Sequence, residues 1–120
     1  MIISFAWTTE AFLAGRKTRT RRLWADDHAA KFHHGDVFQA WDRVPRVGGA
    51  RQIGYGRIVA PLRREHISHL TEEDFESEGF AYMEEKGKTI WGMNMREAFE
   101  NWKEQNLTYW VVDFIRKAGP

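Results

Sequence analysis

The residues best suited to chemistry lie in a short basic segment, residues 15–22. It reads Gly-Arg-Lys-Thr-Arg-Thr-Arg-Arg, so five of the seven positions after the glycine carry a cation. Five unpaired cations cannot all be buried, because each would lose its hydration without compensation. We therefore expect the segment to line a surface or a cleft. Lys17 is placed at a turn, where its ammonium can come near the hydroxyl of Thr20, and hydrolysis by a hydroxyl nucleophile needs such a neighbouring group.

Threonines and alternating residues favour an extended conformation for residues 18–22, in which side chains alternate between two faces. Thr18, Thr20 and Arg22 then share one face, and Arg19 and Arg21 share the other. The simpler interpretation is a solvated edge strand, whose lysine and arginine side chains discourage aggregation. The residues alone favour neither interpretation.

The elements around this segment follow from apolar periodicity and turn residues. A first strand of about five residues is predicted within residues 2–7. A short helix then starts at Thr8 or Thr9, directs Phe12 and Leu13 to the core, and ends at Gly15. Beyond the basic segment we expect a helix over 26–32, a strand over 37–41, and a strand over 53–59 that continues past Pro61 toward residue 67.

The C-terminal half predicts two helices and a last strand. Thr71 and Asp74 form a capping-box pattern, which starts a helix that runs to about Glu78 and stops at Gly79. Residues 80–92 give no clear pattern, a helix with one buried face follows within 94–104, and the strand over 109–115 is apolar on both faces and therefore central. The predicted fold class is α+β: a single domain over residues 1–120, built as a small mixed β-barrel with helices packed over its openings.

Composition narrows the class of protein. Of 120 residues, 42% are hydrophobic and 29% charged, which is typical of a soluble domain. No apolar run has membrane-spanning length and there is no cysteine, so we expect no membrane contact, no disulfide-linked partner and a cytoplasmic location. Residues 1–60 hold ten basic and five acidic residues (+5), and residues 61–120 hold eight and twelve (−4). This asymmetry favours an anionic partner.

The histidines give no convincing metal site. His33 and His34 are adjacent and point in opposite directions if extended, while His66 and His69 lack a clear third ligand. The chain also lacks the glycine-rich loop that holds nucleotide phosphates. We therefore expect no metal and no other cofactor.

Four stretches form a wider pattern: residues 12–21, Gly35-Asp36-Val37, residues 70–73, and Tyr-Trp-Val-Val-Asp-Phe over 109–114. Together they resemble the ASCH domain, a family of small β-barrels in the PUA-like superfamily. The resemblance covers nearly the whole chain, from about residue 2 to residue 115. It implies a PUA-like mixed barrel of ASCH type and an RNA-linked role for the cleft between barrel and helices.

One branch of that family consists of small amidohydrolases that remove the acetyl group from N4-acetylcytidine. The resemblance places the catalytic lysine, threonine and glutamate of this branch on Lys17, Thr20 and Glu78. Thr20 would be the nucleophile, Lys17 its activator or an oxyanion donor, and Glu78 the acid/base. The chain departs from the branch by extra residues from about Ala81 to Met93 and by additional arginines and tryptophans. Without the resemblance, Thr20 is an ordinary strand residue and Glu78 an ordinary exposed carboxylate.

The remaining expectations concern binding. The residues assigned to nucleic-acid or substrate binding are Arg16, Arg19, Arg21, Arg22 and Trp24, the last because a base can stack on its ring. The expected partner is RNA or a modified nucleoside. Two alternatives to the amidohydrolase stay open: a non-catalytic RNA-binding module that uses the basic cleft, and a ribonuclease.

Overall fold

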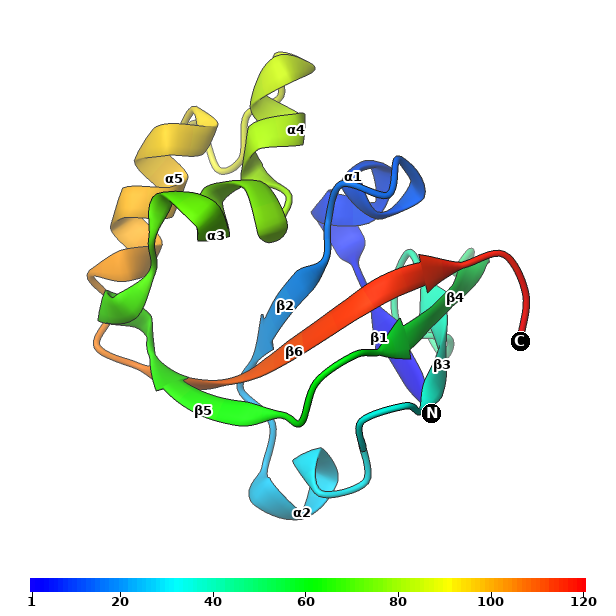
Figure 1. Ribbon diagram of the computed structural model, residues 1–120. Helices are drawn as coiled ribbons and strands as arrows, with labels where there is room; N and C mark the ends of the chain where they lie inside the picture. The colour runs from blue at the N-terminus through cyan, green and yellow to red at the C-terminus, as the bar shows by residue number, and fades with distance from the viewer.

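The computed structural model describes all residues from 1 to 120 and shows a mixed sheet of six strands (Figure 1). The strands are β1 (Ile2–Ser4), β2 (Arg19–Arg22), β3 (Val37–Trp41), β4 (Gln52–Ile58), β5 (Arg63–His66) and β6 (Thr108–Lys117). Their order is β1-β3-β4-β6-β2, with β5 also paired to β6. β1 and β3 are parallel, and the other pairs are antiparallel.

Strand β6 is the centre of the sheet, as its two apolar faces predicted. It pairs with β2 through residues 110–113, with β4 through 114–117, and with β5 through 108–111. β4 and β5 were expected to be one strand that continues past Pro61. The chain instead leaves the sheet after Ile58 and returns at Arg63, because proline has no N–H to donate to a ladder.

The sheet is open rather than closed into a barrel. The strands at the two ends of this order, β1 and β2, each pair with one neighbour only, and no backbone ladder joins them. They are linked by a side chain: Arg22 of β2 donates from Nη2 to the Ser4 carbonyl oxygen of β1, at 2.6 Å.

Three helices group on one side of the sheet: α3 (Glu72–Ser77), α4 (Phe80–Glu85) and α5 (Met95–Lys103) (Figure 1). The remaining helical segments are η1 (Ala6–Thr8), α1 (Thr9–Leu13), α2 (Asp26–Ala29) and η2 (Ile67–His69). The first strand is shorter than predicted, because Ala6 has a φ of 47° and the chain turns into η1. Leu13 is exposed rather than buried, because α1 is little more than one turn long and turns Ala11 and Phe12 inward.

The capping box predicted at the start of α3 is confirmed. The backbone N–H and the hydroxyl of Thr71 both donate to Asp74 Oδ2, at 2.9 and 3.1 Å. The predicted end is also confirmed, because Gly79 has a φ of 98°, a conformation that favours glycine. α3 therefore ends at a defined point, and Glu78 is the residue that caps its C-terminus before the turn into α4.

The apolar core has two parts. One lies against the sheet and contains a group of phenylalanines: Phe5, Phe12, Phe32, Phe38 and Phe114. The other lies under α3, α4 and α5 and contains Phe75, Phe80, Phe99 and Tyr109 among its members. None of the helices combines the length and apolar character needed to cross a bilayer.

The packing of Phe38 on Gly56 predicts a strong effect on stability. The two residues face each other across β3 and β4, and a Cβ on Gly56 would lie 2.2 Å from Phe38 Cζ. Phe38 is fully buried, so its ring has no room to move. Gly56→Ala should lower the free energy of unfolding by about 2–3 kcal/mol in urea denaturation. Gly48→Ala, with nothing within 4 Å of the added carbon, is the control and should change it by less than about 0.5 kcal/mol; equal effects would contradict the packing argument.

Candidate active site

Lys17 is buried directly after α1. The turn at Gly15, with a φ of 73°, reverses the chain, and the backbone N–H of Lys17 donates to the Ala11 carbonyl oxygen. The side chain is only 3% exposed, and its stem packs beside Gly79, where an added Cβ would lie 3.5 Å from Lys17 Cδ. Its Nζ donates to the Glu78 carbonyl oxygen at 2.6 Å and to Glu78 Oε1 at 3.2 Å.

Burial lowers the pKa of Lys17 from 10.5 to about 8, because the ammonium loses hydration. The negative charge of Glu78 opposes this shift, and the positive charges of Arg22 and Arg21 add to it. A substantial fraction of Lys17 is therefore neutral just above physiological pH, and its amine can accept a proton.

Glu78 lies between two cations. Its side chain is 3% exposed, its Oε1 accepts from Lys17, and its Oε2 accepts from Arg21 Nη1 at 2.8 Å. The interpretation of Glu78 as an ordinary exposed carboxylate is therefore wrong. Its position at the end of α3 places it against β2. It therefore contacts Lys17 and Arg21, which lie about sixty positions earlier in the chain.

Thr20 is a buried residue of β2, where it faces Val112 of β6 in the ladder. Its Oγ1 accepts from Arg22 Nε at 3.1 Å, so the predicted sharing of one face by these two residues is confirmed. Lys17 donates to Glu78 and not to Thr20. The expected contact between ammonium and hydroxyl is thus not formed, because Glu78 occupies the ammonium.

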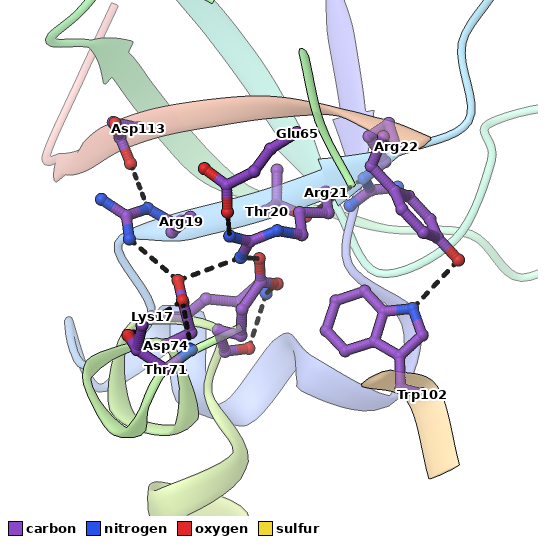
Figure 2. Close-up of polar contacts among 12 residues, drawn as sticks. Lys17, Arg19, Thr20, Arg21, Arg22, Glu65, Thr71, Asp74, Trp102 and Asp113 are labelled. Carbon is purple, nitrogen blue, oxygen red and sulfur yellow. Dashed lines mark hydrogen bonds and ion pairs between the residues drawn. The ribbon is translucent and has the colours of Figure 1, made fainter. Parts of the chain in front are cut away.

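Lys17, Thr20 and Glu78 nevertheless line one pocket of about 480 Å³, together with Arg21 and Arg22. Its apolar wall is largely aromatic and includes Phe5, Trp7, Phe80, Trp91, Trp102 and Tyr109. Trp102 stacks on Phe80. Its Nε1 donates to the Tyr109 hydroxyl at 3.0 Å (Figure 2). The pocket borders both parts of the core and has charged groups against an aromatic wall, an arrangement typical of small-molecule sites.

Arg21 belongs to a buried charge network that the sequence did not reveal. Its side chain is fully buried, and its guanidinium donates to Glu65, Asp74 and Glu78 at 2.7, 3.0 and 2.8 Å. Asp74 Oδ1 also accepts from Arg19 at 2.8 Å, so β2 and α3 are joined by charge-assisted hydrogen bonds (Figure 2). Both arginines reach Asp74, as expected of residues on the same face of β2.

Three of the predicted binding residues do not line the pocket. Arg16 lies at the surface and pairs with Glu76 and Glu85, each at 2.7 Å. Arg19 pairs with Asp74 and with Asp113. Trp24 stacks on Phe32 with ring centroids 4.4 Å apart, so one face of its ring is occupied. Of the expected binding residues, the structure brings only Arg21 and Arg22 to Lys17, Thr20 and Glu78.

Arg22 differs from the other arginines of the segment because it has no carboxylate partner. Its Nε and Nη2 are held by the Thr20 hydroxyl and the Ser4 carbonyl. Its Nη1 has no hydrogen-bond partner and is not fully buried. A cation with a free donor therefore faces the pocket beside the Thr20 hydroxyl. No group of three or more His, Asp or Glu side chains is arranged to hold a metal.

Comparison with known proteins supports the fold and does not name a family. A scan against protein-family models and a search of curated proteins found no match. A search of solved structures found the crystal structure of protein EF3133 from Enterococcus faecalis V583, described by the family model DUF984. The two share 14% sequence identity with a TM-score of 0.55, over 98% of this chain and 78% of that protein. At this identity the likeness shows a shared fold and assigns no activity.

Proposed function

We propose that the protein is an amidohydrolase that removes the acyl group from an acylated cytidine-type base, with N4-acetylcytidine as the substrate to test first. The observation that carries the proposal is the single pocket that Lys17, Thr20 and Glu78 share. The resemblance of the sequence to the ASCH domain supports it.

In the proposed reaction, Thr20 Oγ1 attacks the amide carbonyl carbon. Lys17, with its pKa lowered to about 8, takes the hydroxyl proton when its amine is neutral. The amine must turn from Glu78 toward Thr20 to do so. The C–N bond breaks, and the products of this step are an acyl ester on Thr20 and a free exocyclic amine.

Glu78 completes the proton transfers. It already accepts a hydrogen bond from Lys17, so the proton taken from Thr20 can pass through Glu78 to the leaving nitrogen. The same carboxylate then orients a water molecule, which adds to the ester carbonyl and releases the carboxylic acid. Thr20 regains its proton, and every group returns to its initial state.

Arg22 is placed to stabilise the charge that develops on the carbonyl oxygen. Its Nε donates to Thr20 Oγ1 at 3.1 Å, and Nη1 is free to donate to a ligand. An oxygen bound to the carbon under attack lies within reach of the same guanidinium. In a pocket with a largely aromatic wall, such a fixed donor stabilises the transition state more than it would in bulk solvent.

Binding of long RNA has less support. Arg16, Arg19 and Arg21 are each paired with two or three carboxylates, so few cations remain to neutralise phosphates. An RNA-binding module or a ribonuclease would lose affinity steeply as salt rises. A hydrolase of a neutral nucleoside should keep nearly the same kcat/KM between low and moderate salt, and its activity should leave labelled RNA intact.

Acetate release from N4-acetylcytidine tests the proposal directly. The wild type should release one acetate per cytidine formed, and Thr20→Val should lower kcat by roughly 10³-fold or more because the nucleophile is gone. Thr18→Val is the matched control: Thr18 is two residues away on the same segment and does not line the pocket, so its activity should stay within twofold. If the wild type releases no acetate, the proposal is overturned.

A further inference from the structure

Trp91 occupies a turn that ordinarily excludes a large side chain. Ile90 and Met93 exchange two backbone hydrogen bonds, each 2.9 Å long, across a two-residue turn. Trp91 has a φ of 51° and Gly92 a φ of 75°, so both central residues are left-handed, as in a type I′ turn. Such turns favour Asn-Gly, because a bulky residue at positive φ is strained. Gly92 fits this preference and Trp91 does not.

Trp91 is also the most exposed of the large hydrophobic residues. The residue is 80% exposed, compared with 61% for Leu23, the next most exposed. No aromatic or cation–π contact holds the ring, whereas Trp7, Trp24, Trp102 and Trp110 each have one. Trp91 therefore combines backbone strain with exposed apolar area, and no aromatic ring or cation packs on it to offset either cost. Such costs concentrate at functional sites.

The position of Trp91 connects it to the candidate active site. The residue lines the same pocket as Lys17 and Thr20, next to Ile90 and Met93 of its own turn. It lies within the extra residues 81–93, to which no role is assigned from the sequence. A mostly exposed indole on the wall of a pocket presents a free aromatic face to whatever enters.

We propose that Trp91 is the stacking residue of this site and that it selects substrates with a planar heteroaromatic ring next to the scissile amide. The inference rests on the proposed function and replaces Trp24, which does not line the pocket and has one ring face against Phe32, with a residue that does line it. Stacking on the free face would hold the base at the entrance while its acyl group reaches Thr20 and Arg22. Any base can stack on an aromatic ring, and such stacking is strong enough to determine the affinity for a nucleoside.

The test uses variants of the full chain and two readouts. For Trp91→Ala, we expect the Kd of cytidine, the product, to weaken roughly tenfold by calorimetry. The KM for N4-acetylcytidine should rise by a similar factor, while kcat changes less than about twofold. Trp91→Phe should recover most of the affinity. Leu23→Ala is the control, an exposed apolar residue that does not line the pocket, and should bind cytidine as the wild type does.

Trp91→Asn separates stacking from turn geometry. Asparagine suits a type I′ turn, so this variant should have a higher Tm than the wild type and yet bind cytidine as weakly as Trp91→Ala. Unchanged Kd and KM in both variants would overturn the stacking role while leaving the hydrolase intact. Cytidine binding that depends on Trp91, without acetate release, would uphold the stacking role and overturn the proposed hydrolysis. A wild type that does neither overturns both.

Discussion

Lys17→Met should lower kcat/KM for amide hydrolysis by about 10³-fold, since methionine has a similar shape and cannot accept a proton. The wild-type kcat/KM should rise with pH and level off above about pH 8, because burial lowers the pKa of Lys17 to that value and the neutral amine is the active form. Steady-state rates between pH 6 and pH 10 measure both effects. Lys31→Met, at an exposed position, is the control and should behave as the wild type.

The direction of the pH profile decides the role of Lys17. If kcat/KM falls above about pH 8, Lys17 acts as a cation, and the assignment of a base is wrong. The same pKa shift also affects folding. Between about pH 8 and pH 10.5 the unfolded chain holds a proton on Lys17 that the folded chain has lost. The contribution of Lys17 to the free energy of unfolding therefore becomes more favourable as pH rises through this range.

Asp74→Ala should be among the most destabilising single substitutions in the chain. Asp74 accepts hydrogen bonds from Arg19, Arg21 and Thr71 and is almost fully buried. Its removal takes one carboxylate acceptor from the buried Arg21 and removes the capping box of α3. We expect a loss of about 3–5 kcal/mol in the free energy of unfolding at pH 7, measured in urea. Glu76→Ala, which breaks a surface pair with Arg16, should cost less than about 1 kcal/mol.

The acid dependence of stability provides a second readout. Burial opposes ionisation of Asp74, but hydrogen bonds from Arg19, Thr71 and Arg21 outweigh it and lower the pKa of this carboxyl. Burial likewise opposes ionisation of Asp113, whose pKa is lowered by Arg19 and Arg63. A lowered carboxyl pKa contributes stability that is complete above the usual value of 3.8 and is lost as pH falls below it. Asp74→Asn should lose less stability than the wild type between pH 5 and pH 2, and an equal loss would contradict this assignment.

Much of the local structure could be predicted because its signals lie within a few residues. The capping pattern of Thr71 and Asp74 fixed where α3 begins, and the apolar alternation of residues 109–115 identified β6 as central. The alternation of β2 also predicted which side chains share a face. These features depend on neighbouring residues, so a linear pattern contains them.

The acid partners of the arginines could not be predicted in the same way. Arg21 and Asp74 are 53 positions apart, and Arg19 and Asp113 are 94 apart. Their pairing depends on how β2, α3 and β6 pack together, and no spacing rule specifies that. The basic segment therefore indicated a surface or cleft lined by free cations, whereas most of its charge is neutralised by carboxylates of the protein. Trp91 was missed for the opposite reason, because a tryptophan before a glycine is not a recognised turn signal.

The side chain of Arg22 has a consequence for the motion of the site. One guanidinium ties the two unpaired margins of the sheet to each other through Ser4, and the same group holds the hydroxyl of Thr20. If the margins separate in a fluctuation, the guanidinium loses the Ser4 carbonyl and keeps only the Thr20 hydroxyl of its own strand. The orientation of Arg22 toward a ligand is thus coupled to the breathing of the sheet.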